Sequence, residues 1–374
     1  MHRELTIENF KCFSEKTKVK LGKITVCLGS NSVGKSSVIQ ACILLRQIYE
    51  QAIMFKDTQV KEYNIRLNDV YGLQLGDAEH IKSSKSSEDI CLKIDGYEFI
   101  LSSNSKSPME MIVRNSYDIA KMSSDKGLFS KGFYYLNAER KGPRNYQTID
   151  SKLVDNCGVY GENTVHLLSV LGTHKVEDLR CFSMDKGKKV NTFGKQVEYW
   201  MDYVIPGIEI NADDMTDLRI SRMSLRQSAL DTGFLSPYNF GFGISYVLPI
   251  ILTGLMAESG SVFLVENPEA HLHPKGQSHI GYFLANMALA GVQVIVETHS
   301  EHVINGIRIA ALKNAMKPED ISVNFFSVDS NGRNTNHTVE NIGLNERMDL
   351  ETWPEGFLDQ EEEDLRTLRE LRRR

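Results

Sequence analysis

Apolar and polar residues follow one another in patterns that predict a chain of mixed strands and helices. Leu5–Phe13 and Thr17–Leu21 alternate between apolar and polar residues, as half-buried strands do. Ile90–Leu101 repeats the alternation around Asp95-Gly96, a pair typical of a two-residue hairpin turn. Further apolar runs predict buried strands at 23–28, 261–266, 293–302 and 321–328, and helices at 37–45, 163–171 and 197–205, while 239–252 is a glycine-rich turn that opens an apolar helix. Together these elements predict an α/β fold.

The segment from Gly29 to Ser36 joins the first buried strand to the first apolar helix. Its sequence fits G-x-x-x-x-G-K-[ST] at every defined position. Glycines let backbone N–H groups surround phosphate oxygens, and the helix N-terminus adds its positive dipole. We therefore expect ATP with its β- and γ-phosphates at Lys35, and Mg²⁺ at the Ser36 hydroxyl. The residues expected at the nucleotide are Gly29, Asn31, Ser32, Gly34, Lys35, Ser36 and Ser37.

The composition is that of an ordinary globular protein, with 374 residues, 41% hydrophobic residues and a formal net charge of −6. This charge argues against nucleic-acid binding over the whole surface, although a local contact with DNA stays open. No apolar run is long enough to span a membrane and no signal peptide is evident, so we expect a cytoplasmic protein. The six cysteines form no C-x-x-C pair, which favours reduced packing residues.

Polar residues in the second half of the chain stand where apolar elements begin or end. The strand at 261–266 ends in Glu266, which would present a carboxylate to Mg²⁺ beside the P-loop. The next strand leads into a Thr-His-Ser segment with His299 at its centre. Gly243 and Ser245 open the apolar helix just before Glu266, where a helix N-terminus can hold an anion. These positions predict a second set of phosphate-facing groups.

In this order the motifs make the chain similar to the ABC-type ATPases of the SMC, RecF and OLD group. Like them, it opens with a strand, an Asn-Phe-basic-x-Phe turn, a second strand and the P-loop. The resemblance implies a P-loop ATPase with a mixed central sheet, an N-terminal antiparallel β subdomain and an inserted helical lobe. It places Lys11 and Phe13 at the nucleotide base, Gln74 in a γ-phosphate-sensing loop, and His299 on the γ-phosphate as switch histidine. Packing of Phe13 under the sheet is an equal alternative.

The resemblance also gives Gly243 and Ser245 a role in a neighbouring subunit. In ABC dimers the signature serine of one subunit grips the γ-phosphate held by the other. The segment here is not L-S-G-G-Q, and a plain helix start is the alternative. We expect at least a head-to-tail dimer, or a higher homo-oligomer.

The acidic segment departs from the usual family pattern at one position. Proteins of the OLD and RecF type usually have Asp-Glu-Pro-Glu where this chain has Glu266-Asn-Pro-Glu269. The water-polarising glutamate therefore falls on Asn267, whose amide positions water but cannot accept its proton. Either Glu269 takes over as the base, or hydrolysis is slow and bound ATP is a structural latch. The expected catalytic residues are Asn267, Glu269 and His299, and the expected metal ligands are Ser36 and Glu266.

The motifs divide the chain into four expected parts. These are an N-terminal ATPase lobe (1–144), an inserted, mainly helical lobe (145–235), a C-terminal ATPase lobe (236–345) and a tail with a charged helix (346–374). In the loop after the strand at 133–136, Arg140 and Arg144 are candidates for contacts with phosphate, a partner or nucleic acid, or are simply solvated.

The chain lacks the long heptad repeats of SMC proteins, and no Asp-x-Asp of a Toprim nuclease follows His299. It therefore resembles most the ATPase subunits of Septu-type or retron-associated antiphage systems, which work beside a separate effector, often an HNH nuclease. We expect an ATPase that controls such an effector. A RecF-like DNA-repair ATPase is the alternative, and a transporter ATPase subunit is disfavoured by the signature segment.

Overall fold

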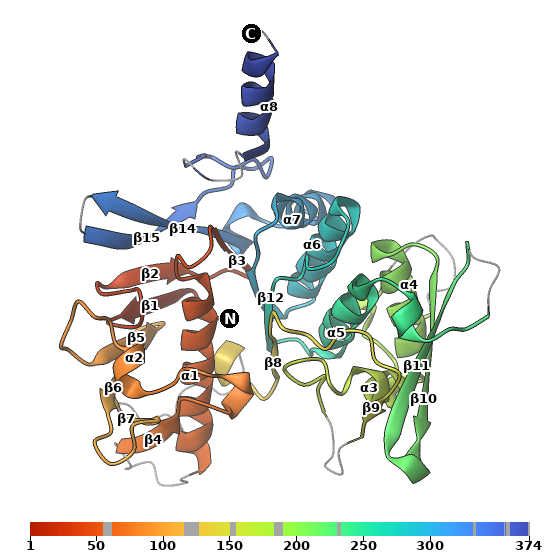
Figure 1. Cartoon of the computed structure of the whole chain (residues 1–374), viewed down its shortest axis with the longest axis horizontal. Helices are drawn as coiled ribbons and strands as arrows, with labels where there is room; N and C mark the ends of the chain where they lie inside the picture. The colour runs from red at the N-terminus through yellow and green to blue at the C-terminus, as the bar shows by residue number, and fades with distance from the viewer. Residues whose placement is uncertain are drawn as a thin grey trace.

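A six-stranded sheet lies at the centre of the molecule (Figure 1). The computed structural model describes residues 1–54, 62–115, 127–149, 155–182, 190–229, 233–331, 334–354, 356 and 360–372. All neighbouring strands of the central sheet run parallel except the edge strand β15, which is antiparallel to β14. The expected mixed central sheet is thus confirmed. Its order is β15 (Asn334–Ile342), β14 (Ile321–Asn331), β3 (Ile24–Gly29), β13 (Gln293–Glu297), β12 (Val262–Glu266) and β8 (Phe133–Leu136).

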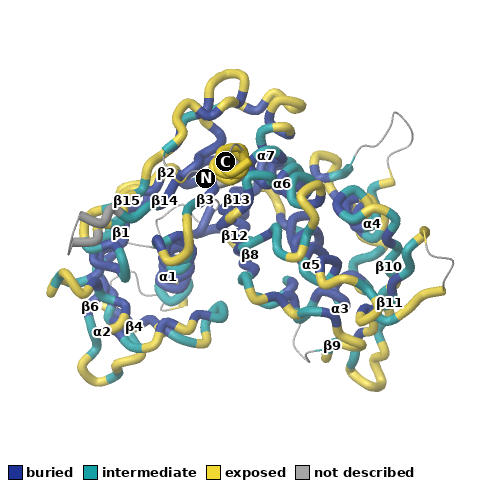
Figure 2. The backbone as a smooth tube through the Cα atoms, turned by 45° about the horizontal axis from the view of Figure 1, so that its top comes forward, coloured by how far each residue is buried: buried dark blue, intermediate teal, exposed yellow. Residues whose placement is uncertain are grey.

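Both faces of the central sheet are covered, which explains why its strands read as continuous apolar runs. Ile24 and Val26 of β3 point into one core, whereas Cys27 points into the other. The first core is shared with the helices α5 (Phe242–Met256), α6 (Pro274–Leu289) and α7 (Glu301–Lys313). The second core is shared with α1 (Lys35–Met54). Figure 2 shows the central strands and α1 as buried, with exposed residues on the outer loops.

An antiparallel sheet from the N-terminal part packs on α1, as expected (Figure 1). Asp95 and Gly96 both have positive φ, 47° and 91°, so the predicted two-residue hairpin turn is confirmed. From the sequence we expect residues 102–130, rich in Ser, Lys and Asp, to form an irregular connection, and this prediction is wrong at the strand Glu110–Asn115, whose Met111 and Val113 alternate into the core. The sheet order is β2 (Thr17–Lys20), β1 (Glu4–Glu8), β5 (Ile90–Ile94), β6 (Tyr97–Ser103), β7 (Glu110–Asn115) and β4 (Glu62–Arg66), with α2 (Ala78–Ile81) nearby.

The inserted lobe contains more strand than predicted. It has the helices α3 (Thr164–Leu171) and α4 (Phe193–Val204), and also a three-stranded sheet in the order β10, β11, β9. On β11, Met223 and Leu225 are buried at alternate positions and polar residues separate them, so the strand gives no continuous apolar run. The sheet strands are β9 (Gln147–Thr148), β10 (Ile208–Met215) and β11 (Ile220–Gln227).

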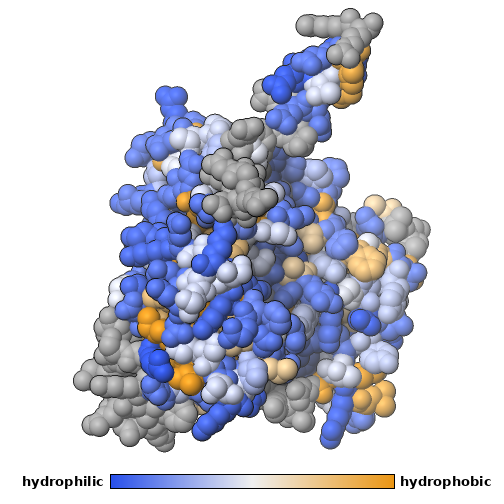
Figure 3. All heavy atoms as spheres, turned by 60° about the vertical axis from the view of Figure 1, so that its left-hand side comes forward, coloured by the Kyte–Doolittle hydropathy of each residue, from blue (hydrophilic) through white to orange (hydrophobic). Residues whose placement is uncertain are grey.

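The tail ends in a helix that stands away from the rest of the molecule (Figures 1 and 3). This helix, α8 (Gln360–Leu371), exposes the apolar side chains of Leu365, Leu368 and Leu371. Among the described residues, no helix combines the length and the apolar character that a membrane crossing needs. Short 3₁₀ helices lie at Val70–Gly72, Gly127–Phe129, Asp178–Arg180, Thr216–Leu218, Pro237–Asn239 and Pro318–Asp320.

Candidate nucleotide-binding site

An open cleft with about 940 Å³ of empty volume lies where β3, β12 and β13 reach their carboxyl ends. This is the edge at which parallel α/β sheets bind ligands. The predicted residues that line it are Lys11, Asn31, Ser32, Gly34, Lys35, Ser36, Ser37, Glu266, Asn267 and His299. The structure therefore brings together segments that are separated by more than two hundred residues in the sequence.

The P-loop is held in shape by two glycines and by its own lysine. Gly29 has φ of 141°, and a Cβ there would lie 2.2 Å from the carbonyl oxygen of Phe326. Gly34 has φ of 113°, a conformation that side-chain-bearing residues rarely adopt. The Lys35 ammonium donates to the carbonyl oxygens of Gly29 and Ser30, at 3.0 and 2.5 Å. Burial lowers the pKa of Lys35, although nearby Glu297 favours its charged form.

The aromatic residue expected at the nucleotide base packs beneath the P-loop instead. Phe13 is 1% exposed, and its ring lies 6.4 Å from that of Phe326. A Cβ at Gly34 would come within 2.6 Å of the Phe13 ring, which shows how closely the ring supports the loop. The packing alternative therefore holds for Phe13. Lys11 does line the cleft and donates to Gln40 Oε1 at 2.6 Å, so its contact with a nucleotide stays a prediction.

Gln74 lies outside the cleft, contrary to its expected role. Its side chain is exposed and donates to Asp69 Oδ1 at 3.3 Å. A backbone bridge between Asn68 and Gln74 closes this loop on itself. The direction of a single glutamine side chain in a loop cannot be predicted from the sequence, because no periodic pattern assigns it to one side.

Two buried carboxylates stand side by side on adjacent strands. Glu266 of β12 and Glu297 of β13 are paired in the parallel register, so both arrive at the same edge. Glu266 Oε1 accepts a hydrogen bond from Tyr135 OH at 2.7 Å, and Glu297 Oε1 accepts one from Ser36 Oγ at 2.8 Å. Burial raises the pKa of Glu266, and burial together with repulsion from Glu266 raises the pKa of Glu297 to about 7. Sequence reasoning overlooked Glu297, although it ends an apolar strand directly before the Thr-His-Ser segment.

Asn267 adopts a left-handed backbone conformation, with φ of 44°. Asparagine tolerates this region better than most residues. Its N–H donates to the carbonyl oxygen of Glu297 at 2.8 Å, and its buried Oδ1 has no hydrogen-bond partner in the part of the chain that the structure describes. Asn267 thus lines the cleft, and its backbone N–H ties the loop after β12 to the end of β13.

Arg140 fixes the loop that carries Asn267. Its guanidinium donates to the carbonyl oxygens of Glu266 and Asn267, at 2.7 and 2.6 Å. It also lies 5.3 Å from the ring centre of Tyr246 on α5. Arg140 is 2% exposed, so the expectation that it contacts phosphate, partner or solvent is wrong. Its role is to anchor backbone carbonyl groups.

Glu269 supports the Thr-His-Ser segment at 298–300, called here the switch segment. Its Oε2 accepts from Thr298 Oγ1 at 2.7 Å, and its Oε1 accepts from the backbone N–H of His299 at 2.8 Å. Both oxygens are therefore engaged, and Glu269 is not among the residues that line the cleft. The His299 side chain does line it, and burial together with nearby Lys35 lowers the pKa of this histidine. A base role for Glu269 stays a prediction that this geometry does not favour.

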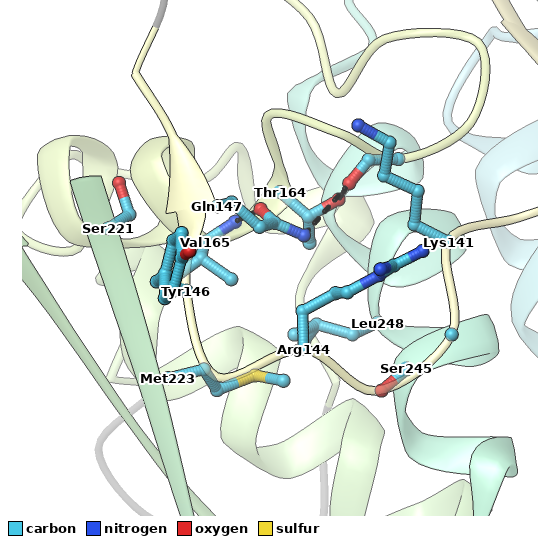
Figure 4. Close-up of a pocket in the computed structure, with 12 residues that line it drawn as sticks. Lys141, Arg144, Tyr146, Gln147, Thr164, Val165, Ser221, Met223, Ser245 and Leu248 are labelled. Carbon is cyan, nitrogen blue, oxygen red and sulfur yellow. Dashed lines mark hydrogen bonds between the residues drawn. The ribbon is translucent and has the colours of Figure 1, made fainter. Parts of the chain in front are cut away.

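The signature residues lie apart from this cleft. Gly243 is buried on α5, and a Cβ there would lie 2.8 Å from the carbonyl oxygen of His271. Ser245 lines a separate small pocket together with the basic side chains of Lys141 and Arg144 (Figure 4). The P-loop and Ser245, which is expected to belong to the signature, therefore lie at different places in one chain.

The donor set of the cleft fits a Mg²⁺ ion bound with a nucleotide. Ser36 offers a hydroxyl and Glu266 and Glu297 offer carboxylates, while Glu297 Oε2 is buried and has no partner among the residues described. In the described part of the chain, no group of three or more His, Cys, Asp or Glu side chains could hold a metal. Mg²⁺ in nucleotide sites needs few protein ligands, because phosphates and water supply the rest.

The fold and the site define a P-loop ATPase. The chain belongs to the family described as AAA ATPase domain, which it matches over residues 1–193. Residues 196–305 match a family described as AAA domain, putative AbiEii toxin, type IV toxin–antitoxin system. Residues 316–368 match a family of proteins of unknown function, DUF3696. No curated protein matches the chain in sequence.

A solved SMC head is similar in fold to most of this chain. An SMC head bound to the C-terminal winged-helix domain of ScpA has a TM-score of 0.50 and 12% identity, covering 93% of this chain and 99% of that one. A head from Thermotoga maritima gives 0.44 and 8%, over 92% and 99% of the two chains. A head with an extended coiled coil, bound to ScpA from Pyrococcus furiosus, gives 0.47 and 10%, over 99% of both. The expected ABC-type ATPase fold is confirmed.

Proposed function

We propose that this ATPase works as a nucleotide-dependent homodimer, or higher homo-oligomer, that hydrolyses ATP slowly and controls a separate effector protein. The effector we propose is a nuclease of the HNH type, and the setting is bacterial antiphage defence. The match of residues 196–305 to a family described with a toxin–antitoxin system supports this setting. The chain supplies the ATP-driven part.

The separation of Ser245 from the nucleotide cleft carries the proposal. Lys35 and His299 line the cleft, whereas Ser245 lines a different pocket beside Arg144. If Ser245 and the first turn of α5 bind a γ-phosphate, that phosphate must belong to a second copy. The exposed ring of Phe242, at the start of α5, offers apolar surface for that copy to cover.

The residues of the cleft divide the work of hydrolysis as follows. The P-loop amides and Lys35 bind the β- and γ-phosphates, and Ser36 and Glu266 face the metal. When bound, Mg²⁺ neutralises charge that develops on the phosphates. Asn267 Oδ1 can orient water, but an amide oxygen is too weak a base to take its proton. Losing a general base costs about 10²–10⁴-fold in rate, so the ATP-bound state would be long-lived.

The oligomer is tested by light scattering with ATP and Mg²⁺. We expect the unmodified protein to be at least dimeric under these conditions and Ser245→Arg to remain monomeric while still binding ATP. Ser87→Arg, an exposed position on the N-terminal lobe, is the control and should dimerise. A protein that stays monomeric with ATP and Mg²⁺ even beside its effector would contradict the proposal.

The effector is tested by co-purification with the product of the neighbouring reading frame. We expect its nuclease activity to be low while ATP is bound and to rise when ATP is exhausted. If the isolated ATPase instead binds duplex DNA with an affinity that falls steeply with salt, the RecF-like alternative is favoured.

A further inference from the structure

The P-loop hydroxyl bonds to an acid from the strand that lies between β3 and β12. Strand β13 separates these two strands in the sheet, and its last residue is Glu297. Ser36 Oγ donates to Glu297 Oε1 at 2.8 Å. The acid at the end of the strand 261–266, Glu266, instead accepts from Tyr135, on the far neighbour β8. The carboxylate nearest to the metal-binding hydroxyl is therefore Glu297.

Glu297 also has a buried oxygen without a hydrogen-bond partner among the described residues. The residue is 4% exposed, it lines the cleft, and its Oε2 has no hydrogen-bond partner among the described residues. A buried carboxylate oxygen without a partner is costly, and a cation beside it removes that cost. The neighbouring carboxylate of Glu266 adds repulsion that the same cation would relieve. Hydrogen bonds among the described residues leave this buried oxygen without a partner.

Position 267, between the two acidic strand ends in the sequence, carries a neutral amide. Asn267 takes the place of an acid, while Glu297 adds one on the next strand, and the backbone N–H of Asn267 donates to the carbonyl oxygen of Glu297. Among the described residues, the acids that line the cleft are Glu266 and Glu297, and Asn267 adds no charge to them.

We propose that Glu297 is a metal-facing carboxylate of this site, sharing with Ser36 and Glu266 the binding of the divalent cation that accompanies ATP. The assignment rests on the proposed nucleotide-binding function and adds a residue to it. Glu297 is a positioning and binding residue for the cation. It is not proposed as the base.

The test measures Mn²⁺ binding by electron paramagnetic resonance in the presence of a non-hydrolysable ATP analogue. We expect Glu297→Gln to weaken Mn²⁺ binding at least about tenfold, the scale on which metal sites respond to the loss of a supporting group. Glu258→Gln, at an exposed position, is the matched control and should leave Mn²⁺ affinity unchanged. Binding of a fluorescent ATP analogue in EDTA should be unchanged or tighter in Glu297→Gln, since a negative charge has left the cleft.

Two results separate the possible failures. If the unmodified protein does not bind the analogue even without metal, the proposed function fails and this assignment falls with it. If the analogue binds but Glu297→Gln keeps Mn²⁺ affinity within twofold of the control, the assignment alone is overturned. Melting temperatures establish that each variant is folded. If the glutamine variant does not fold, Glu297→Ala replaces it, and unchanged Mn²⁺ affinity in this variant, which lacks the carboxylate, overturns the assignment equally.

Discussion

Glu269 accepts a hydrogen bond from the backbone N–H of His299 at 2.8 Å, although 30 positions separate the two residues in the chain. The second carboxylate oxygen accepts from the hydroxyl of Thr298. These two bonds hold the switch segment against the loop that follows β12. An acid that looked like a spare general base is thus fully occupied as a brace.

Replacing Glu269 by glutamine and by alanine distinguishes a brace from a base. A glutamine can accept from the His299 N–H with its oxygen and donate to Thr298 with its amide, so Glu269→Gln should keep hydrolysis within a few fold. Glu269→Ala removes both bonds and should cost about 1–3 kcal/mol of stability and much of the activity. Single-turnover hydrolysis and thermal unfolding measure both. A loss of about 10²-fold or more in Glu269→Gln, with ATP binding intact, would show instead that Glu269 is the base.

Lys35→Ala should abolish measurable ATP binding. The change removes the ammonium group that the carbonyl oxygens of Gly29 and Ser30 hold in the cleft. ATP binding then loses the charge-assisted hydrogen bonds from this ammonium group to the phosphates, each worth about 1.5–3 kcal/mol. Isothermal titration calorimetry measures the affinity. Lys23→Ala is the control, because Lys23 pairs with Asp320 at 2.8 Å and does not line the cleft. Equal affinity in Lys35→Ala and the control would refute the P-loop assignment.

The P-loop and the central strands could be predicted from the sequence because their signals are local. Gly29 and Gly34 stand where the phosphate loop demands unusual backbone conformations, and the strand around Val26 is apolar because both of its faces are covered. The positions of Phe13 and Gln74 could not be predicted in this way. Whether an aromatic ring lies above or below a loop depends on contacts such as that with Phe326, 313 positions away.

Introducing an acid at position 267 should raise turnover if hydrolysis lacks a base. Asn267→Glu restores the usual family residue, but φ of 44° makes a left-handed glutamate cost about 1 kcal/mol in stability. Asn267→Asp tolerates the backbone better and carries a shorter acid. We expect turnover to rise tenfold or more in Asn267→Glu and less in Asn267→Asp, in steady-state phosphate-release assays. Equal turnover in all three proteins, at equal ATP affinity, would mean that position 267 does not limit the rate.

Acid should loosen the contact between the insert and the ATPase lobe. The ring of His279 on α6 stacks on the ring of Tyr203 of α4, with 3.9 Å between the ring centres, and its Nδ1 bonds to the Tyr203 carbonyl oxygen. Burial lowers the pKa of His279 below its ordinary 6.5; the hydrogen bond to Tyr203 opposes this shift, and Lys275 and Lys313 add to it. Because the folded pKa is depressed, the unfolded chain takes up a proton first, and stability falls as pH drops below about 6.5. Denaturant unfolding at pH 7.5 and pH 5.5 should show a smaller loss in His279→Gln. An identical loss would exclude His279 as a source.

Residues such as Glu297 and Arg140 show why the site was only partly predictable. Glu297 follows an apolar strand, as Glu266 does, but only the strand order places it beside Ser36. From its sequence position Arg140 looked like an exposed cation in a loop. It is buried because it donates to the carbonyl oxygens of Glu266 and Asn267, and no sequence pattern indicates that these carbonyl groups need a side-chain donor. A hydrogen bond to a distant backbone carbonyl group does not depend on which side chain that residue carries, so the amino-acid sequence does not reveal it.

Arg140 touches the backbone at Asn267 on one side and the ring of Tyr246 on the other. In the proposed dimer each chain binds one ATP in its own cleft and contacts the ATP of the partner subunit with its α5 helix. A shift of the loop at Asn267 on ATP binding would therefore reach α5, and so the second nucleotide, through a single guanidinium. Such coupling would make the binding of the two ATP molecules cooperative, so the doubly filled form would be lost more steeply as ATP levels fall than with independent sites.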